Sequence, residues 1–323
     1  MQVAGAGMAG LVAAARLREL GRNVVVREKG TRLGGSMLLS SCVVWRHREL
    51  GEFRAECPYG DERLQRVIWE RLDDALACDV ALGADGCDGD APLILCTGGF
   101  AASSELVTRY VQPAAPLRLR ANPWSEGDGL RHAVARGAAL SSGMDEFYGR
   151  NMPDAPWDES ELVTLSQLFA RFARIYDETG VEFFAGGDVS WSETNVVQAT
   201  ARRPGARAYS VLDDEALGRR VRERTVGEMI EAAPAEARVA ISDLPFAAPP
   251  GSVAAVRVIS SITHTLGGLR VDEQARVLRE DGSTIDGLWA AGVDAGGVAL
   301  GGYASGLAQA LVLGLAAAED AAR

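Results

Sequence analysis

The chain has 323 residues, 47% of them hydrophobic, and its formal net charge is −11 at pH 7. This length suits one large domain or two ordinary ones, and an acidic balance without a basic tract argues against a nucleic-acid partner. No apolar run is long enough to span a membrane, and the N-terminus shows no signal peptide, so we expect a cytoplasmic protein. The five cysteines have no metal-binding or disulfide spacing, which favours reduced thiols and no metal site.

The first thirty residues predict a strand, a glycine-rich turn, a helix and a second strand. The turn reads GAGMAG from Gly5 to Gly10, between a strand over residues 2–4 and a helix that ends near Leu20. The second strand, over residues 23–27, leads to Glu28, an acid eighteen positions past the last glycine. A GxGxxG motif in this context predicts a dinucleotide-binding site.

Each position of this motif has a physical reason. Gly5 permits the tight turn, Gly7 lets a pyrophosphate approach the backbone, and Gly10 lets the helix pack closely on the strand. The helix N-terminus presents unpaired amides and a partial positive charge to the phosphates. Glu28 is placed to accept hydrogen bonds from the hydroxyls of the adenosine ribose.

The next segment, KGTRLGGS over residues 29–36, adds the glycine pair Gly34 and Gly35 before Ser36. Here the sequence resembles the FAD-dependent oxidoreductases related to fumarate reductase and succinate dehydrogenase flavoproteins, a group that includes ketosteroid dehydrogenases. The resemblance implies that GGS runs along the FAD pyrophosphate and that the serine-rich stretch to Ser41 lies beside the isoalloxazine. No histidine of this stretch matches the covalent attachment seen in some relatives, so noncovalent FAD is implied.

The middle of the chain continues the resemblance. Asp61 is a plausible cap of a helix over residues 61–77, and a short strand over residues 92–96 runs into Thr97-Gly98-Gly99, similar to the family's ATGG strand. The GDG turn around Asp128 opens another helix, where the residue either lies near FAD or only caps the helix. The connection over residues 78–91 is shorter than in relatives, which puts the affinity for FAD in question.

Residues from about 144 to 251 differ in character and predict an inserted cap domain. We expect a hairpin turn at residues 177–180, a helix over residues 193–202 and a strand over residues 206–212. A cap that closes over the flavin would shield the reaction from water.

The C-terminal third resembles the family's closing motif of a strand, a glycine-rich loop and a long helix. We expect a hairpin over residues 272–283, a strand over residues 287–292 and a final helix from near Tyr303. The N-terminus of this helix should stabilise negative charge on the reduced flavin. Where the family has AGE, this chain has Val293, and Asp294 could substitute for the glutamate that holds the ribityl chain.

The catalytic candidates follow from the same resemblance. The segment His264-Thr265-Leu266-Gly267-Gly268 matches the family's HTxGG, whose histidine contacts the substrate. Tyr303 lies in the glycine loop, and ketosteroid dehydrogenases use tyrosines to polarise a carbonyl or to take a proton. Glu193 stands where fumarate reductases carry a proton-donating arginine, and the arginine of their closing loop has no counterpart either. Fumarate reduction is therefore not expected.

Together these observations predict an α/β protein. Its two-dinucleotide-binding-type FAD domain, a Rossmann-like parallel sheet, is formed by residues 1–143 and 256–323, with an α+β cap over residues 144–255. The expected function is dehydrogenation or reduction of a carbon–carbon bond next to a carbonyl or carboxylate of a small molecule, with an unknown electron acceptor. The alternatives are a shortened non-catalytic FAD-binding relative and a nicotinamide-dependent dehydrogenase. The residues expected to hold FAD are Gly5, Gly7, Met8, Ala9, Gly10, Glu28, Lys29, Gly34, Gly35, Ser36, Ser40, Thr97, Gly98, Gly99, Asp128, Gly292, Asp294, Ser305 and Leu307.

Overall fold

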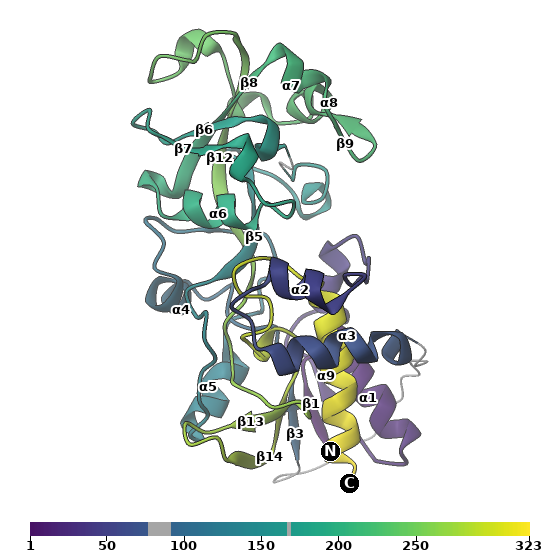
Figure 1. Cartoon of the computed structure of the whole chain (residues 1–323). Helices are drawn as coiled ribbons and strands as arrows, with labels where there is room; N and C mark the ends of the chain where they lie inside the picture. Colours follow the sequence, from purple (N-terminus) through teal and green to yellow (C-terminus); the bar gives the residue numbers. More distant parts are fainter. Residues whose placement is uncertain (77–91, 167–168) are drawn as a thin grey trace. The chain divides into compact units, whose positions relative to one another are not determined.

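The computed structural model describes residues 1–76, 92–166 and 169–323, which form two compact units (Figure 1). Unit 1 consists of Met1–Val111, Ala121–Glu146 and His264–Arg323, and unit 2 of Gln112–Arg120 and Phe147–Thr263. Unit 2 thus contains most of residues 144–255, where we expect the cap, together with the earlier segment Gln112–Arg120 and residues up to Thr263. The shortened connection over residues 78–91 lies outside the described residues.

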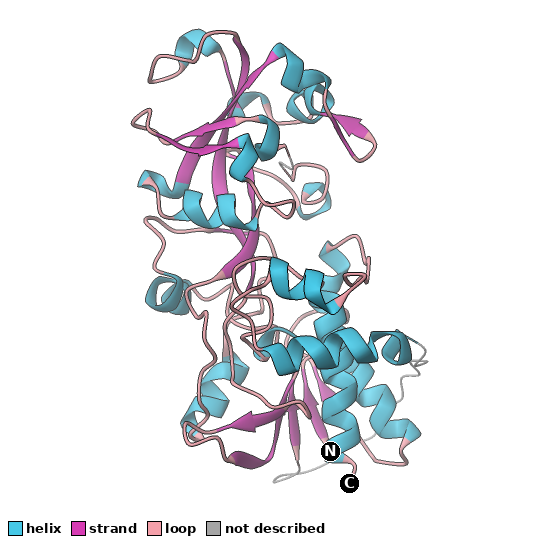
Figure 2. Cartoon of the chain, in the orientation of Figure 1, coloured by secondary structure: helices cyan, strands magenta, loops and turns pink. Residues whose placement is uncertain are grey.

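Unit 1 is built on a mostly parallel sheet with the strand order β13-β14-β3-β1-β2 (Figure 2). Strands β1 (Gln2–Ala4), β2 (Val25–Arg27), β3 (Leu93–Leu95) and β14 (Thr284–Ala290) are parallel, and β13 (Arg276–Leu278) is antiparallel to β14. Short apolar runs such as the LIL of β3 are typical of strands covered on both faces. The predicted Rossmann-like parallel sheet is confirmed, and β1, which lies between β3 and β2, leads directly into the glycine turn.

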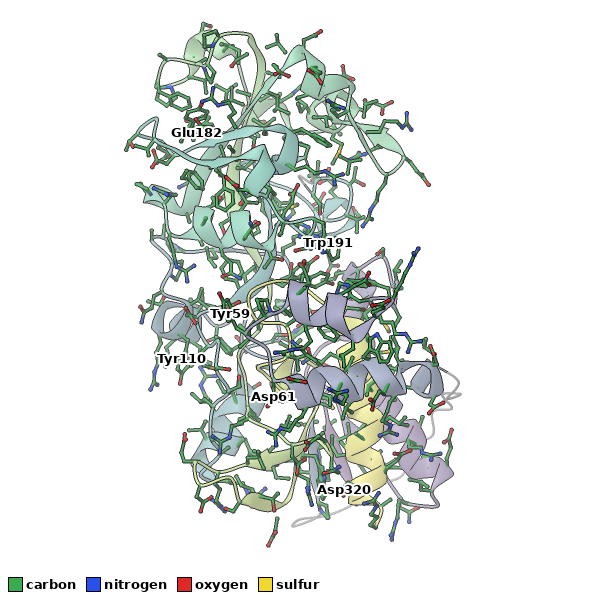
Figure 3. The ribbon with its side chains drawn as sticks, in the orientation of Figure 1. Tyr59, Asp61, Tyr110, Glu182, Trp191 and Asp320 are labelled. Atoms are coloured by element: carbon green, nitrogen blue, oxygen red, sulfur yellow. The ribbon has the colours of Figure 1, made fainter. Side chains whose placement is uncertain are left out.

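Three long helices of unit 1 pack in a row, α1 (Met8–Glu19) on α9 (Gly306–Ala321) and α9 on α3 (Glu62–Leu76) (Figure 1). Asp61 Oδ1 accepts hydrogen bonds from the amides of Arg63 and Leu64, so the predicted cap at the start of α3 is present (Figure 3). Trp289 Nε1 donates to Asp320 Oδ2 at 3.1 Å and ties β14 to the end of α9. Among the described residues of this unit, the other α-helices are α2 (Leu50–Glu56), α4 (Ser104–Leu106) and α5 (Asp128–Ala135).

Unit 2 contains a sheet with the order β11-β12-β8-β6-β7, and β4 and β5 also pair with β12. Strands β6 and β7 form the hairpin predicted at residues 177–180, and Asp177 Oδ1 accepts the amides of Thr179 and Val181 at its turn. The apolar side chains of these strands pack on α6 and α8 to form a separate core. The bounds of the elements are β4 (Arg118–Leu119), β5 (Phe147–Pro153), β6 (Arg174–Tyr176), β7 (Glu182–Ala185), α6 (Thr194–Ala201), β8 (Arg207–Asp213), α7 (Asp214–Gly218), β9 (Arg220–Val221), β10 (Arg224–Thr225), α8 (Val226–Glu231), β11 (Arg238–Val239) and β12 (Ser252–Thr265).

Two boundaries near the C-terminus differ from the prediction. The final helix begins at Gly306 rather than near Tyr303, because the hydroxyl of Ser305 accepts the amide of Ala308 and caps the helix there. The turn over residues 280–283 joins β13 directly to β14. The second strand of the predicted hairpin and the separate strand expected at residues 287–292 are therefore the same strand, β14.

Candidate functional site

The N-terminus of α1 is open to an anion. Its N-cap residue, Gly7, has no side chain to cap the first turn, and no acidic residue lies in that turn, which begins with Met8 and Ala9. The amides there are left to bind a ligand, and the helix dipole favours a negative one. Gly5 adopts a φ of 99°, and an added Cβ would lie 2.1 Å from the carbonyl oxygen of Cys96, so only glycine fits the turn.

The second predicted glycine segment lies directly against the first. The Gly34 amide donates to the Ala6 carbonyl at 2.8 Å, and a Cβ on Gly35 would lie 3.3 Å from Cα of Gly7. Ser36 Oγ accepts a hydrogen bond of 2.6 Å from Asn122 Nδ2, which fixes the end of this segment. Two stretches distant in sequence thus form one surface of bare backbone beside the α1 N-terminus.

Glu28 lies at the end of β2, where the sequence predicted a ribose-binding acid. Its Oε2 accepts the Ala6 amide at 2.7 Å and its Oε1 accepts the Gly30 amide at 2.6 Å. These two bonds fix the carboxylate beside the glycine turn, and each oxygen keeps acceptor capacity for a hydroxyl group.

Three of the residues expected to hold FAD make other contacts in unit 1. Lys29 Nζ pairs with Asp128 Oδ2 at 2.9 Å and with the carboxylate of Glu126, and all three side chains are about half exposed. Asp128 is the first residue of α5, whose N-cap is Gly127, so it lies one position past the cap. Ser40 Oγ donates to the Met37 carbonyl at 2.8 Å.

Asp294 is 2% exposed and binds the loop that follows β3. Its Oδ1 accepts the hydroxyl of Thr97 at 2.9 Å and the amide of Gly99 at 3.1 Å, and its Oδ2 accepts the Thr97 amide. Burial raises the pKa of Asp294, and these hydrogen bonds oppose the rise. Gly98, in the same loop, adopts a φ of 90°. Gly292 lies close to α1, because a Cβ added to it would be 3.2 Å from the Cβ of Ala9. The carboxylate of Asp294 therefore shapes the Thr97–Gly99 loop.

His264 lies against the first turn of α9. A Cβ on Gly306 would be 3.3 Å from Cε1 and 3.6 Å from Nε2 of the imidazole ring. Burial lowers the pKa of His264 to about 4, so the ring is neutral at physiological pH. Ser305 caps this turn, and Leu307, which follows Gly306, is half-buried in it. The structure therefore places His264 of the HTLGG segment against the first turn of the closing helix.

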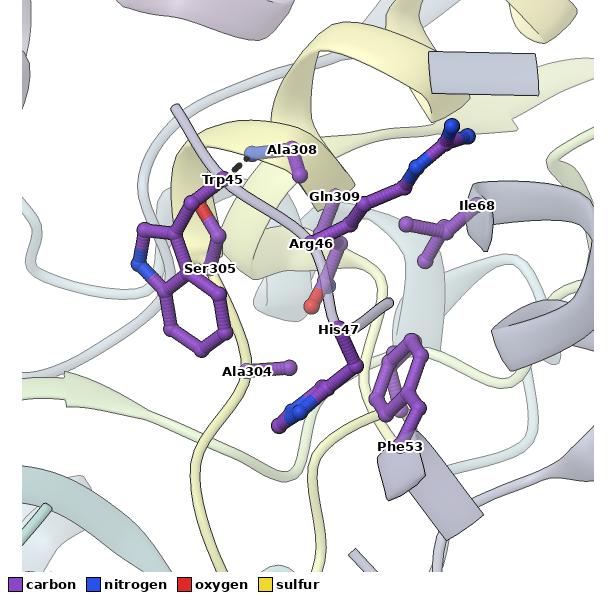
Figure 4. Close-up of a pocket in the computed structure, with 10 residues that line it drawn as sticks. Trp45, Arg46, His47, Phe53, Ile68, Ala304, Ser305, Ala308 and Gln309 are labelled. Carbon is purple, nitrogen blue, oxygen red and sulfur yellow. Dashed lines mark hydrogen bonds between the residues drawn. The ribbon is translucent and has the colours of Figure 1, made fainter. Parts of the chain in front are cut away.

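A hollow of about 270 Å³, its open mouth included, lies beside the same helix end (Figure 4). Aromatic residues form one wall, where the His47 ring lies 5.2 Å from that of Trp45 and 5.6 Å from that of Phe53. The buried His47 Nε2 has no hydrogen-bond partner among the residues that the structure describes, whereas the Arg46 side chain extends away to the Trp69 carbonyl and Asp73. The lining residues are Trp45, Arg46, His47, Phe53, Ile68, Val298, Ala304, Ser305, Ala308 and Gln309.

The closing glycine loop, defined here as residues 296–303, is held by two carboxylates that the sequence analysis missed. Glu146 Oε2 accepts the Gly301 amide at 2.7 Å, and Glu56 Oε1 accepts the Tyr303 amide at 3.2 Å. The Tyr303 ring is half-buried and lies 5.9 Å from that of Trp45. Neither glutamate is part of a motif, and only the folded chain brings them to the loop.

Glu193, the predicted catalytic residue of the cap, is buried in unit 2. It is 3% exposed and is the N-cap residue of α6, with a φ of 56° that is uncommon outside glycine. Its Oε1 accepts the Ala170 amide at 2.9 Å, and within the described parts of the chain its Oε2 has no hydrogen-bond partner. Burial raises the pKa of Glu193 to about 8, although the charge of Arg150 opposes the rise. The carboxyl group is therefore mostly protonated at neutral pH.

Comparison with known families agrees with this geometry. A family model described as an FAD binding domain matches residues 87–307, more than half of the chain, and one for an NAD(P)-binding Rossmann-like domain matches residues 3–49. The chain belongs to the FAD-binding domain family. The predicted likeness to fumarate reductase and succinate dehydrogenase flavoproteins is thereby confirmed.

The individual relatives are distant. A fumarate reductase of Schizosaccharomyces pombe is 25% identical over 246 residues, which cover 64% of this chain and 47% of that protein. An NADH:acrylate oxidoreductase of Vibrio harveyi is 48% identical over 46 residues, which cover 14% of this chain and 5% of that protein. The chain spans less than half the length of these curated relatives.

Solved structures show the same fold at low identity. A 3-ketosteroid Δ1-dehydrogenase from Sterolibacterium denitrificans superposes with a TM-score of 0.71 at 14% identity, covering 99% of this chain and 98% of that one. A flavocytochrome c3 fumarate reductase in an open conformation gives a TM-score of 0.68 at 18% identity, covering 99% and 77%. A 3-ketosteroid-Δ4-(5α)-dehydrogenase from Rhodococcus jostii gives 0.67 at 16% identity, covering 100% and 96%.

The residues present fit the cofactor of this family. The uncapped α1 N-terminus and the bare glycine backbone provide the amides that a pyrophosphate needs, and Glu28 supplies an acceptor for the ribose. The buried Nε2 of His47 lines the hollow beside the α9 N-terminus, has no partner in the described ranges, and suits a polar atom of a bound ring. Among the described residues, no helix is long and apolar enough to cross a bilayer, and no cluster of three or more potential ligands could hold a metal.

Proposed function

We propose that this chain binds FAD noncovalently and catalyses the dehydrogenation or reduction of a carbon–carbon bond next to a carbonyl or carboxylate. The observation that carries the proposal is the position of neutral His264 against the N-terminus of α9, next to the glycine loop that bears Tyr303. FAD, when bound, supplies the group that accepts or donates a hydride. Every other task falls to side chains and backbone of this chain.

Binding falls to the N-terminal half of unit 1. The amides at the start of α1 would hold the pyrophosphate, and Glu28 would hold the ribose hydroxyls. The N-terminus of α9 would stabilise negative charge that develops on the ring system during reduction. Glu28, Gly7 and Met8 are half-buried, and FAD bound over them would exclude water and strengthen each interaction.

Proton handling falls to three groups. Neutral His264 can donate a hydrogen bond to a substrate oxygen, and the Tyr303 hydroxyl can polarise that oxygen or exchange a proton. Glu193 is proposed as an acid of unit 2 by itself, because its buried carboxyl group is mostly protonated at neutral pH and its Oε2 has no partner within the described residues. The substrate carbon that does not exchange the hydride would exchange its proton with one of these groups.

The first test is the visible absorption spectrum of the purified protein before and after denaturation. We expect two flavin bands that survive desalting and free FAD after denaturation, whereas flavin that stays with the polypeptide would contradict noncovalent binding. His264→Ala should then lower turnover with an artificial acceptor at least about a hundredfold. A protein that holds FAD but shows no turnover with any tested substrate would favour the non-catalytic alternative.

A further inference from the structure

We infer that His47 is a cofactor-binding residue, whose Nε2 donates a hydrogen bond to a carbonyl oxygen on the rim of the bound flavin ring. This inference rests on the proposed function and adds a contact to its cofactor site. The hollow beside α9 is where the contact would form, and all residues that line this hollow belong to unit 1.

The lining of this hollow is mainly apolar, and its polar side chains have hydrogen bonds elsewhere. Ser305 Oγ accepts the Ala308 amide at 3.3 Å. Gln309 Nε2 donates to two main-chain carbonyls at 3.0 and 2.7 Å, and the Arg46 guanidinium is bound outside the hollow. Nε2 of His47 is the exception, since this buried atom of the lining has no hydrogen-bond partner in the parts of the chain that the structure describes (Figure 4).

The position of the His47 ring is fixed by its neighbours. The rings of Trp45 and Phe53 lie against it, with centroids 5.2 and 5.6 Å from its own. The main-chain carbonyl of His47 accepts Trp69 Nε1 at 3.0 Å, and the adjacent Arg46 donates to the Trp69 carbonyl at 2.7 Å and lies over the indole ring. The segment is thereby attached to α3. A donor held in this way is pre-organised, which lowers the entropic cost of binding an acceptor.

The state of the imidazole favours an uncharged oxygen as its acceptor. Burial lowers the pKa of His47, although the charges of Glu56 and Glu52 oppose the change, so the ring is neutral at physiological pH. A neutral imidazole carries one proton, and with that proton on Nε2 it donates a single hydrogen bond into the hollow. A carbonyl oxygen accepts such a bond without bringing a charge into an apolar lining.

The place of the hollow points to the ring of the cofactor. Ala304, Ser305 and Ala308 bring the N-terminus of α9 into its lining, and this helix end is where the proposed function stabilises negative charge on the flavin ring. A flat ring packs well against aromatic side chains, and the flavin ring bears carbonyl oxygens on its rim. A water molecule or a substrate carbonyl in the hollow would instead leave FAD binding insensitive to His47.

The first experiment compares the affinities of the FAD-free chain for FAD and for ADP, which has the adenosine and the pyrophosphate but lacks the flavin ring. His47→Phe keeps an aromatic ring and removes Nε2, whereas His47→Gln places an amide nitrogen close to the position of Nε2. We expect His47→Phe to weaken FAD binding roughly tenfold, as the loss of one buried hydrogen bond does, and to leave ADP binding unchanged. His47→Gln should recover most of the loss. His132→Phe, which replaces an exposed histidine of α5, is the matched control and should change neither affinity.

The outcomes separate the inference from the proposed function. Equal FAD binding by the wild type and His47→Phe overturns the inference and leaves the proposed function standing. An equal loss of FAD and ADP binding also overturns it, because His47 would then act only through the packing of unit 1. A wild type that binds ADP but not FAD refutes the proposed cofactor and the inference together. If His47→Phe fails to fold, the smaller His47→Leu, which also lacks a polar atom, takes its place.

The second experiment measures the midpoint potential of the FAD-loaded chain by equilibration with a reference dye. A donor at a rim oxygen binds the electron-rich reduced ring more tightly than the oxidised ring, because negative charge gathers on that oxygen. His47→Phe should therefore weaken binding of the reduced ring roughly tenfold more than binding of the oxidised ring, which for a two-electron couple is a fall of about 30 mV. His132→Phe should keep the wild-type potential. A potential that stays the same or rises in His47→Phe overturns donation by Nε2.

Discussion

Replacement of Gly10 by alanine should push α1 away from the preceding strand, β1. A methyl carbon at this position would lie 1.9 Å from the carbonyl oxygen of Gly5 and 3.2 Å from Cγ1 of Val3. Since non-bonded atoms prefer a separation of about 3.5 Å, the helix would have to move by about 1 Å or more. Overpacking of this kind costs about 3 kcal/mol at the upper end of the usual range, and alanine returns about 1 kcal/mol of helix propensity. The expected net loss is about 2 kcal/mol.

This loss can be measured in two ways. The melting temperature of the FAD-free protein should fall by about 4–8 °C, and FAD titrated by fluorescence should bind at least about tenfold more weakly, because the amides at the start of α1 move away from the pyrophosphate. The matched control is Gly51→Ala in α2, where an added Cβ meets no atom within 4 Å. The control should leave FAD binding unchanged and slightly stabilise the protein. Wild-type stability and FAD affinity in Gly10→Ala would refute the close approach of helix and strand.

Three further predictions concern buried or half-buried acids and the candidate histidine. Glu28→Ala removes the acceptor of the Ala6 amide and should weaken FAD binding roughly tenfold in a fluorescence titration, whereas an unchanged affinity would exclude a ribose contact. The pKa of Glu193 is about 8 in the folded protein, against an ordinary value of 4.5. Between pH 4.5 and 8 the folded state therefore keeps a proton that the unfolded state has lost. The free energy of unfolding in urea should fall by a few kcal/mol as the pH rises through this range. Glu193→Gln should abolish that slope, and a slope that persists would assign it to another group. His264, with its pKa lowered from 6.5 to about 4, should instead lower stability as pH falls from 6.5 to 4, and His264→Gln should remove this acid-side loss.

Much of unit 1 could be predicted because its signals are local. A glycine motif with a strand before it and a helix after it defines β1, α1 and β2, and Asp61 caps α3 where the sequence places the cap. The parallel sheet follows from the same alternation of strands and helices. The start of α9 was placed three residues early, because the cap at Ser305 competes with other starts in a glycine-rich loop that offers no periodic pattern.

The contacts within the site were harder to predict because they join segments far apart in sequence. The pairing of Lys29 with Asp128 and the binding of Asp294 to Thr97 depend on how strands meet at the sheet edge. Glu56 was missed for the same reason, because a glutamate in an ordinary amphipathic helix carries no sign that it will bind a loop amide. Secondary-structure propensity depends on a residue and its neighbours in sequence, whereas these contacts join residues that are distant in sequence.

The interleaved order of the two units bears on how the chain folds during synthesis. Unit 1 is made of three segments separated by parts of unit 2, and β14 and α9 come from the last of them. Strand β3 therefore lacks one neighbour, and α1 lacks its packing partner, until β14 and α9 have left the ribosome. Native contacts of such long sequence separation form slowly, and an apolar strand edge exposed in the meantime can pair with other chains. Recombinant yield should thus depend on chaperone capacity and growth temperature, and truncation before β14 should give insoluble material rather than a smaller folded domain.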